Sequence, residues 1–321
     1  MNEEEWIARY IHPRGNPAHP LSGPGDDAAL LPSPTGTATV LSVDALVSDQ
    51  HFKIDWLSDW HPPGILARRL LRGSLSDISA MGGIATGVLL SLESDQLPGF
   101  FSEAFWEEVD TELQIHSMTL LGGNLTRCTT GLSLHATVVG HVEPDRCWRR
   151  DSAKPGDRIG VTGFPGKAAQ ALDQLQSGIP MTDSDPWRSP ASRQRFATEL
   201  NRKMQRTACA IDLSDGLGLD LQRVCKASEI SAQIDIAPLV ASEDAPNPSQ
   251  VVAGGEDYEL LLVVDPDEMA TVEEVAVETG TPFHWLGYAE TIHDRPAIEW
   301  RLAGEKIETL PAKQGWDPFQ K

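Results

Sequence analysis

The sequence contains few cysteines and no long hydrophobic run. Its four cysteines, Cys128, Cys147, Cys209 and Cys225, are scattered and form no C-x-x-C pair. This argues against a disulfide framework or a zinc site and favours reduced thiols in a cytoplasm. No apolar run approaches the roughly 18 residues that span a bilayer, and the acidic start Met-Asn-Glu-Glu-Glu-Trp is unlike the basic start of a signal peptide. We therefore expect a soluble, cytoplasmic protein.

Positive charge is also scarce. The chain has 26 Lys and Arg against 47 Asp and Glu, which gives a formal net charge of -21. Binding to nucleic acid or to an anionic membrane relies on Lys and Arg that neutralise phosphates, so this charge argues against both kinds of partner. Most of the acidic residues are expected to form a solubilising surface. A polyanionic ligand such as a nucleotide would bind here only with the help of cations.

Two catalytic signatures are missing as well. The sequence has no Gly-x-Ser-x-Gly segment and nominates no Ser/His/Asp set. The segment Gly163-Phe164-Pro165-Gly166-Lys167 lacks the spacing and the following Ser or Thr of a Walker A phosphate loop. We interpret this segment as a structural turn.

The length of 321 residues favours two domains of ordinary size. The polar, turn-rich stretch 149–157 is the best boundary, which gives one domain at 1–148 and a second at 149–321. Strands and helices alternate along the chain, which predicts an α/β (α+β) fold. Helices are predicted at 4–10, 64–81, 101–115, 167–175 and 268–279, and strands at 38–43, 87–92, 132–142, 159–162, 208–213, 232–236 and 259–264, with further strands on either side of Gly122-Gly123.

Two aspartates follow an apolar strand in Ile211-Asp212-Leu213-Ser214-Asp215-Gly216. A helical apolar pattern begins directly afterwards, so both aspartates lie at the C-terminal end of a strand, where α/β sheets place their ligands. Asp215 by itself has an alternative role as a helix cap. Asp212 has no such explanation, because an apolar strand would bury its charge at a cost. For this segment, ligand binding and capping both stay open.

Other carboxylates occupy comparable places. Asp77 lies near the C-terminal end of an apolar helix, where its charge opposes the helix dipole and calls for a cationic partner. Asp26 and Asp27 lie in a glycine turn, and Asp44 follows a strand. Two carboxylates about 4 Å apart repel by roughly 4 kcal/mol at an effective dielectric constant near 20. If these acids converge, divalent cations must hold them, and oxygen ligands indicate Mg²⁺ rather than zinc.

Two glycine pairs give weaker signals. Gly122-Gly123 lies between apolar stretches and by itself fits an ordinary hairpin turn. Gly254-Gly255 precedes three acids, Glu256, Asp257 and Glu259. These acids fit either an edge-strand turn or a contact with a ligand.

Taken together, the motifs resemble those of the thiamine-monophosphate kinase family, within the superfamily of aminoimidazole ribonucleotide synthetase and selenophosphate synthetase. They run in family order over nearly the whole chain, and the two final segments are the most specific. The matching segments are Gly25-Asp26-Asp27-Ala28; Ser42-Val43-Asp44, followed by His51-Phe52; Leu75-Ser76-Asp77, followed by Ala80-Met81-Gly82; Gly122-Gly123; Lys154-Pro155-Gly156-Asp157; Ile211 to Leu217; and Gly254 to Leu260.

The resemblance implies ATP-dependent phosphorylation of thiamine monophosphate to thiamine diphosphate. It also implies a homodimer with a two-domain synthetase-like fold: an N-terminal mixed sheet that pairs in the dimer and binds ATP and several Mg²⁺ ions, and a C-terminal α/β sandwich that completes the active site. The acceptor phosphate is already ionised near neutral pH, since its second pKa is about 6, so no catalytic base is expected. By motif match, the metal ligands are Asp26, Ser42, Asp44, Asp77, Asn124, Asp212 and Asp215, the ATP contacts are Gly123, Asn124, Arg150 and Ser214, and the substrate contacts are His51, Glu256 and Trp316.

Three positions depart from the family pattern. Asn124 stands in place of an Asp, Val43 in place of a metal-binding Thr, and Ser74 in place of an Asn. These departures leave open an alternative, a catalytically weakened or altered-substrate nucleotide-binding member of the superfamily. Selenophosphate synthetase and the hydrogenase-maturation relative are disfavoured, because no Cys precedes Cys128 and none follows Cys225.

Overall fold

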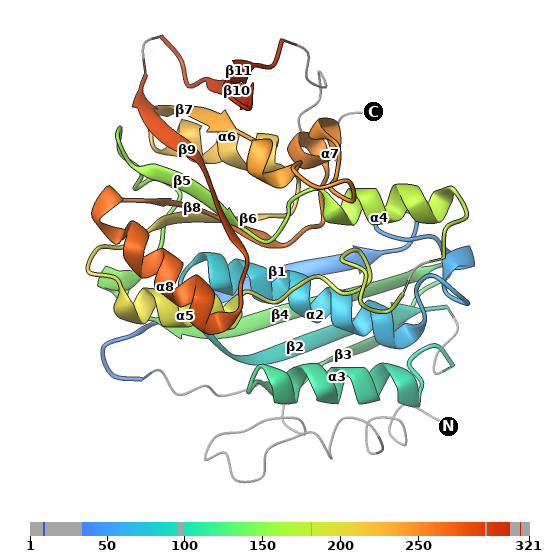
Figure 1. Cartoon of the computed structure of the whole chain (residues 1–321). Coiled ribbons are helices and arrows are strands. Elements are labelled where there is room, and N and C mark those ends of the chain that lie inside the picture. Colours follow the sequence, from blue (N-terminus) through green and yellow to red (C-terminus); the bar gives the residue numbers. More distant parts are fainter. Residues whose placement is uncertain are drawn as a thin grey trace. The chain divides into compact units, whose positions relative to one another are not determined.

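The computed structural model describes residues 9, 34–95, 99–180, 182–292, 294–308 and 315. The chain divides into two compact units, Met1–Ile78 with Ile84–Pro144, and Ser79–Gly83 with Asp145–Lys321 (Figure 1). The second unit resumes at Asp145, whereas the turn-rich stretch predicts a boundary after residue 148. The helix expected at 4–10, apart from Arg9, and the candidate ligands Asp26 and Trp316 lie outside the described residues.

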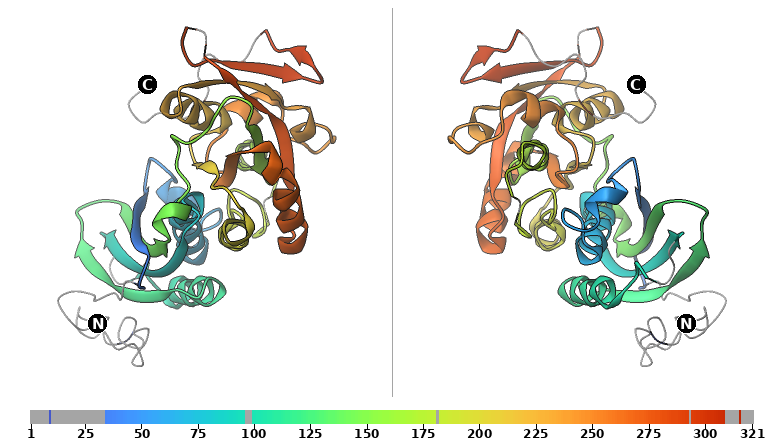
Figure 2. Two further views of the ribbon diagram at one scale, coloured as in Figure 1. Left: turned by 90° about the vertical axis from the view of Figure 1, so that its left-hand side faces the viewer. Right: turned by 90° about the vertical axis from the view of Figure 1, so that its right-hand side faces the viewer.

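The first unit contains a four-stranded mixed sheet. Its strands are β1 (Ala38–Val47), β2 (Ile84–Ser94), β3 (Thr119–Arg127) and β4 (Leu132–Val142). They lie in the order β1-β4-β2-β3, and only β2 and β3 are parallel neighbours. Helices α2 (Pro63–Ala80) and α3 (Glu103–Ile115) pack on one face of this sheet (Figure 2). The strand predicted at 132–142 is thus confirmed with its bounds, and the strands at 38–43 and 87–92 and the helices at 64–81 and 101–115 are confirmed with shifted ends.

The opposite face of this sheet carries exposed apolar side chains. Leu41 is 64% exposed and Val43 is 68% exposed. They alternate along β1 with residues that face the helices, as successive side chains of a strand must. Ile84 of β2, 43% exposed, belongs to the same face, because Ile84 and Thr39 both pair with His141. We call the surface formed by Leu41, Val43 and Ile84 the open face.

A buried ion network joins the two helices of the first unit. Glu112 of α3 is fully buried and accepts two hydrogen bonds from Arg72 of α2, at 2.9 and 2.7 Å. His116 Nε2 lies 3.3 Å from Glu112 Oε2, without hydrogen-bond geometry. Burial by itself raises the pKa of Glu112, but His116 and Arg72 outweigh it and lower the pKa to about 2. The carboxylate therefore stays charged inside the helix pair.

The glycine pair Gly122-Gly123 lies inside β3, so the interpretation of two strands flanking a glycine turn is wrong. Gly122 pairs with Leu89 and Gly123 with Leu90 of β2. A Cβ on Gly123 would lie 1.9 Å from the carbonyl oxygen of Leu90. Glycine is needed here because the two backbones approach closely, and a sequence pattern does not separate that need from the need for a turn.

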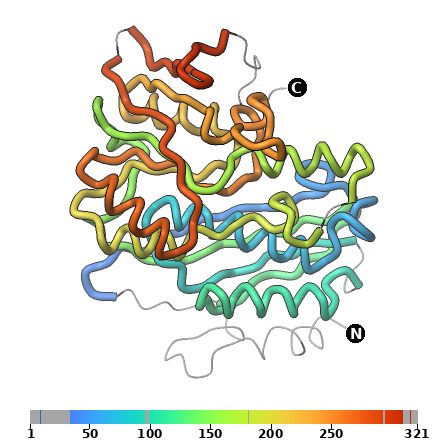
Figure 3. Tube along the Cα trace, in the orientation of Figure 1, coloured from blue at the N-terminus to red at the C-terminus, as the bar shows by residue number. Residues whose placement is uncertain are grey.

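The second unit contains a seven-stranded mixed sheet with helices on both faces. Its strand order is β11-β10-β7-β9-β5-β8-β6. Figure 3 follows the same backbone as a tube coloured along the sequence. Along β8, Leu261 and Val263 pack with α6 and α7, whereas Leu260 and Leu262 pack with α5 and α8. A strand covered on both faces is apolar along its length, which explains the continuous apolar run at 260–264. The strands are β5 (Arg158–Thr162), β6 (Cys209–Leu213), β7 (Ile230–Asp235), β8 (Glu259–Val264), β9 (Phe283–Thr291), β10 (Ile298–Leu302) and β11 (Glu305–Lys306), and the helices are α4 (Lys167–Gln176), α5 (Gln194–Lys203), α6 (Leu217–Ala227), α7 (Pro248–Ala253) and α8 (Met269–Thr279).

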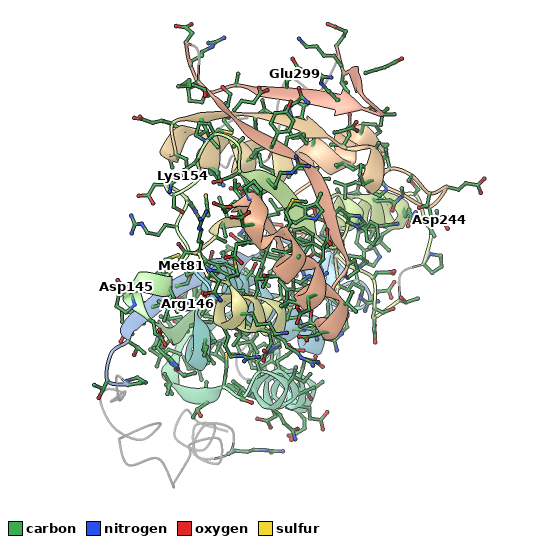
Figure 4. All side chains as sticks on the ribbon, turned by 60° about the vertical axis from the view of Figure 1, so that its left-hand side comes forward. Met81, Asp145, Arg146, Lys154, Asp244 and Glu299 are labelled. Carbon is green, nitrogen blue, oxygen red and sulfur yellow. The ribbon has the colours of Figure 1, made fainter. Side chains whose placement is uncertain are left out.

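Residues 79–83 belong to the second unit although they follow the body of α2. The N–H of Trp148 donates to the carbonyl of Met81 at 3.1 Å, and the Asn201 side chain donates to the carbonyl of Gly82 at 2.7 Å. Met81 is labelled in Figure 4 together with Arg146, a residue of the same unit. Gly82 has a φ of 65°, and α2 ends before it, as the sequence predicts.

Helices α5 and α7 are not predicted by the sequence patterns. Helix α5 buries Phe196, Ala197 and Leu200 in the core it shares with α8, but its other positions are largely polar. Helix α7 has only six residues and starts with a capping box between Asn247 and Gln250. Short 3-10 turns occupy Ile54–Trp56, Pro144–Arg146, Ala237–Leu239 and Pro266–Glu268. Among the described residues, the helices are too short or too polar to cross a membrane.

Candidate active site

The turn between β6 and α6 carries two predicted metal ligands. Asp212 is the next-to-last residue of β6 and only 3% exposed, and Asp215 comes directly before Gly216, the N-cap residue of α6. Gly216 has a φ of 119°, and a Cβ there would lie 2.9 Å from the carbonyl oxygen of Gly254. This turn therefore requires glycine. Both aspartates lie at the C-terminal end of the strand, as the sequence predicts.

A buried acid inside α6 holds the turn that precedes the helix. Oδ2 of Asp220, a fully buried side chain, accepts the backbone N–H groups of Asp215 and Gly216, both at 3.1 Å. Burial raises the pKa of Asp220 to about 6, against the opposing charge of Arg223. The Asp215 carboxylate instead pairs with Arg223, whose Nη2 lies 2.6 Å from Oδ2. The N-cap residue of α6 is Gly216 and not Asp215, so the alternative interpretation of Asp215 as the helix cap is wrong.

The segment 254–259 brings a further carboxylate to the same turn. The N–H of Glu256 donates to the carbonyl of Ser214 at 2.8 Å, and the N–H of Tyr258 donates to the carbonyl of Leu213 at 2.9 Å. Glu256 has a φ of 63°, a left-handed conformation that is uncommon outside glycine. Its Oε2 accepts the indole N–H of Trp187 at 2.8 Å. Glu256 is thus held next to the aspartate turn in a fixed conformation.

Asp257 has a structural role. Its buried carboxylate accepts the N–H groups of Gly166, at 2.7 Å, and Ala168, at 3.0 Å. Burial raises its pKa to about 8, although these two hydrogen bonds oppose the shift. The carboxylate occupies the start of α4, where a phosphate would otherwise find free N–H groups. The glycine segment 163–167 is therefore a structural turn, as the sequence indicates.

Glu259 is structural as well. It accepts a hydrogen bond from Arg193 Nη2 at 2.6 Å and one from the Thr162 hydroxyl at 2.5 Å. It starts β8, which lies between β5 and β6, so the edge-strand interpretation of this segment is wrong. Of the three clustered acids, Glu256 is the one whose position suits contact with a ligand.

In the first unit, β1 and α2 bring two predicted ligands together. The hydroxyl of Ser42 donates a hydrogen bond to Oδ2 of Asp77. Asp44 lies two residues further along β1 and therefore faces the same side of the sheet. Asp44 Oδ1 accepts the N–H of Ala45 at 2.7 Å. Ser42, Asp44 and Asp77 form a group of oxygen ligands on the helix side of the sheet.

Two of the three sequence departures do not touch this group. Val43 belongs to the open face, so an oxygen at this position would point away from Ser42 and Asp44. Ser74 is buried and donates its hydroxyl to the carbonyl of Leu70 at 2.8 Å, within α2. Neither substitution removes a side-chain ligand from the helix side of β1.

His51 presents a defined tautomer. Its Nδ1 accepts the backbone N–H of Val47 at 3.1 Å. A nitrogen that accepts a hydrogen bond carries no proton, so the proton of the neutral ring lies on Nε2. The ring therefore has an N–H donor of the kind that binds a phosphate oxygen.

Asn124 and Gly123 lie apart from the Ser42 group. They are on β3, one edge of the sheet, whereas Ser42 and Asp44 are on β1, the opposite edge. Three interstrand spacings amount to about 14 Å, while two ligands of one Mg²⁺ ion lie within about 4 Å of each other. Asn124 of the same chain therefore does not share an ion with Ser42 or Asp44. Its Nδ2 donates to the Thr126 hydroxyl at 2.8 Å.

Arg150, the remaining predicted ATP contact, has an exposed side chain. The backbone carbonyl of Arg150 accepts the Ser228 hydroxyl at 2.8 Å, which fixes the main chain. Within the described ranges, its guanidinium forms no ion pair. It is thus a cation available to a phosphate group.

The oxygen donors fit Mg²⁺. Within the part of the chain that the structure describes, no three His, Cys, Asp or Glu side chains are close enough to hold a metal ion by themselves. Mg²⁺ does not need such a cage, because it binds one or two carboxylates and takes water or substrate phosphates as its other ligands. Ser42 and Asp77 together offer one partial set of ligands, and Asp215 offers another. At Asp215 the Arg223 guanidinium already occupies the place of a cation.

Sequence patterns missed three residues near these ligands: Asp220, Arg223 and Trp187. Asp220 and Arg223 are three residues apart on a predicted helix, a spacing that indicates an ion pair. Trp187 and Glu256 are 69 positions apart, and no local pattern relates them.

Comparison with known proteins agrees with these motifs. Residues 25–142 match the family model of AIR synthase related protein, N-terminal domain. The thiamine-monophosphate kinase of Escherichia coli strain K12 is 34% identical over 331 aligned positions, which cover 99% of this chain and 98% of that protein. The chain belongs to the thiamine-monophosphate kinase family.

Solved structures of thiamine-monophosphate kinases share the fold. The enzyme from Stenotrophomonas maltophilia K279a aligns with a TM-score of 0.74 and 26% identity, over 95% of this chain and 96% of that one. AaThiL complexed with AMPPCP and TMP aligns with a TM-score of 0.70 and 21% identity, over 92% and 91% of the two chains. The prediction of a mixed α/β, synthetase-like fold is confirmed.

Proposed function

We propose that this protein transfers the γ-phosphoryl group of ATP to thiamine monophosphate and releases thiamine diphosphate and ADP. The full-length similarity to the Escherichia coli kinase supports this reaction. So does AaThiL, which has the same fold and binds AMPPCP and TMP. The observation that carries the proposal within this chain is the backbone hydrogen bond that fastens Glu256 to the turn with Asp212 and Asp215, at the C-terminal end of β6.

The proposed site needs no catalytic base. The nucleophile is an oxygen of a phosphate monoester, which is ionised near neutral pH because its second pKa is about 6. The side chains have to hold two anionic groups in line and offset their charge. Mg²⁺ supplies the positive charge when it is bound. Its proposed ligands are Asp26, Ser42, Asp44, Asp77, Asn124, Asp212 and Asp215.

Separate residues serve the nucleotide and the acceptor. Gly123, Asn124, Arg150 and Ser214 are proposed to contact ATP, and the exposed guanidinium of Arg150 suits a phosphate. His51, through Nε2–H, suits the acceptor phosphate, and Glu256 and Trp316 are the other proposed substrate contacts. ATP and Mg²⁺ binding are assigned mainly to residues 1–148, and residues 149–321 complete the site.

A homodimer is part of the proposal. The open face exposes Leu41 and Val43 of β1 and, two strands away, Ile84 of β2, and exposed apolar side chains on one face of a sheet are typical of a protein–protein interface. A second copy of the sheet would cover it. A cytoplasmic location agrees with the free thiols of Cys128, Cys147, Cys209 and Cys225.

The alternative, a weakened or altered-substrate nucleotide-binding protein, now depends on Asn124. Its amide brings an oxygen to a metal but no negative charge, so one Mg²⁺ ion would bind less tightly. Val43 no longer favours this alternative, because its side chain lies on the open face.

An assay of ADP release with the full-length protein tests the reaction. We expect ADP release that requires both thiamine monophosphate and Mg²⁺, with one thiamine diphosphate formed per ADP. Thiamine, which has no phosphate to accept the transfer, is the control acceptor. ATP binding in calorimetry without any thiamine diphosphate would reject the kinase and support the alternative.

A further inference from the structure

Arg223 of α6 holds two carboxylates at once. Its Nη2 lies 2.6 Å from Oδ2 of Asp215, and its Nη1 lies 2.5 Å from Oδ1 of Asp220. A guanidinium is planar and rigid, so the three side chains form one connected unit. None of the roles proposed above uses Arg223.

The two carboxylates differ in whether they can change partners. Asp220 is fully buried and also accepts the N–H groups of Asp215 and Gly216, so the turn itself depends on it. The side chain of Asp215 is 22% exposed. Among the residues that the structure describes, Asp215 pairs with no cation other than Arg223. Asp215 can therefore exchange its partner without breaking the turn.

Arg223 is able to leave Asp215. Its side chain is 41% exposed, and Nη1 can stay on Asp220 when Nη2 moves away. A divalent ion at Asp215 Oδ2 would stand within contact distance of the guanidinium, and two cations so close repel strongly. One of them excludes the other.

We infer that Arg223 is a built-in counter-ion that occupies Asp215 in the metal-free protein and gives it up to a divalent cation while staying on Asp220. The inference rests on the proposed role of Asp215 as a metal ligand. It has two consequences. Arg223 weakens divalent-cation binding at this turn, and it stabilises the turn when no metal is bound.

Mn²⁺ serves as the probe, and the electron paramagnetic resonance signal of free Mn²⁺ measures its binding to the full-length protein without nucleotide. Arg223→Met removes the charge and keeps a long side chain. We expect it to bind Mn²⁺ at least threefold more tightly than the wild type, at a site that Asp215→Asn removes. Arg223→Lys keeps the charge, so its affinity for Mn²⁺ should lie between those of the wild type and Arg223→Met. The control is Arg202→Met, which breaks the i,i+3 pair with Glu199 on α5 and should leave Mn²⁺ binding unchanged.

Thermal unfolding gives a second readout. In EDTA, Arg223→Met should unfold at a lower temperature than the wild type. Added Mn²⁺ should raise the Tm of Arg223→Met by more than it raises the Tm of the wild type. Equal or weaker Mn²⁺ binding by Arg223→Met overturns the inference, and so does a lack of binding by both proteins. If Asp215→Asn binds Mn²⁺ as well as the wild type, the metal role of Asp215 is wrong and the inference fails with it. The ADP-release assay with thiamine monophosphate judges the kinase reaction separately.

Discussion

The indole nitrogen of Trp187 lies 2.8 Å from Oε2 of Glu256. Trp187 is 2% exposed, and Glu256 has a left-handed backbone conformation. A buried donor thus fixes one oxygen of a carboxylate that lies beside the aspartate turn. Trp187 therefore acts as a positioning residue for the proposed substrate contact.

Trp187→Phe should weaken the use of thiamine monophosphate. The change removes the N–H donor and keeps an aromatic ring in the same buried place. A hydrogen bond to a charged acceptor contributes about 1.5 kcal/mol or more, so we expect KM for thiamine monophosphate to rise about tenfold while KM for ATP stays the same. Steady-state kinetics with each substrate varied in turn provides the measurement.

Trp285→Phe is the matched control for Trp187→Phe. Its indole donates to Glu273 at 2.9 Å in the same unit, and its loss should leave both KM values unchanged. In a Glu256→Gln background, the further change Trp187→Phe should raise KM for thiamine monophosphate only slightly. A full tenfold effect in that background would show that Trp187 does not act through Glu256.

Asn124→Asp should preserve or raise activity. The new carboxylate adds a negative charge to a proposed metal ligand, and the Thr126 hydroxyl, now 2.8 Å from Asn124 Nδ2, can donate to it. We expect half-maximal activity at a Mg²⁺ concentration several-fold lower than for the wild type. Gln114→Glu, at an exposed position of α3 in the same unit, adds the same charge and should not change the Mg²⁺ requirement. A large loss of rate in a folded Asn124→Asp protein would contradict the metal assignment.

Val43→Lys should separate the proposed homodimer. Val43 lies on the open face, and an interface that covers it would have to bury an unpaired ammonium group, which is costly. Light scattering coupled to size exclusion should report the monomer mass for this variant and the dimer mass for the wild type. Val277→Lys changes a valine that is 83% exposed on α8 and should leave the dimer intact. A Val43→Lys protein with the mass of a dimer would place the interface elsewhere.

Glu112→Gln should change how stability depends on pH. The folded-state pKa of Glu112 is lowered from 4.5 to about 2, so its contribution is present above pH 4.5 and is lost as the pH falls toward 2. At 1.36 kcal/mol per pKa unit, this contribution is about 3 kcal/mol at pH 6.5 and about half of that at pH 3. Urea unfolding should therefore show that the free energy of unfolding of the wild type exceeds that of the variant by about twice as much at pH 6.5 as at pH 3.

Glu199→Gln is the control for the ion network of Glu112. Glu199 pairs with Arg202 on the surface of α5, where water screens the charges and such pairs contribute little. Glu199→Gln should therefore leave the free energy of unfolding almost unchanged at both pH 6.5 and pH 3. If the gap between wild type and Glu112→Gln is as wide at pH 3 as at pH 6.5, the charge of Glu112 is not what stabilises the helix pair.

Apolar periodicity predicted most of the elements. Helix α2 at Pro63–Ala80 and strand β8 at Glu259–Val264 agree closely with the predicted 64–81 and 259–264, because long or fully buried segments have the clearest patterns. Helix α5 was not predicted, because few of its side chains are apolar and their packing partners lie in α8. Gly122-Gly123 misled the prediction, since a close approach of strands and a turn both require glycine.

For the site, a local pattern located carboxylates but did not assign their roles. The strand-to-helix turn that carries Asp212 and Asp215 follows from the apolar run, the glycine and the helical period, all within a dozen residues. The same stretch does not tell which acid holds the turn before α6. Asp220 does so because its side chain is buried against two N–H groups of the turn.

By itself, the sequence determined the strand, the glycine turn and the helix that set two aspartates at a strand end, because such preferences are local and depend on side-chain size, backbone freedom and apolar period. Only the tertiary structure decided what each acid of the 256–259 segment does. Each acid has a hydrogen-bond partner that is distant in the sequence. Asp257 binds Gly166 at the start of α4, 91 positions away, Glu259 binds Arg193, 66 positions away, and Glu256 binds Trp187, 69 positions away. The role of a carboxylate depends on the donors and charges that folding brings to it, and these come from distant parts of the chain.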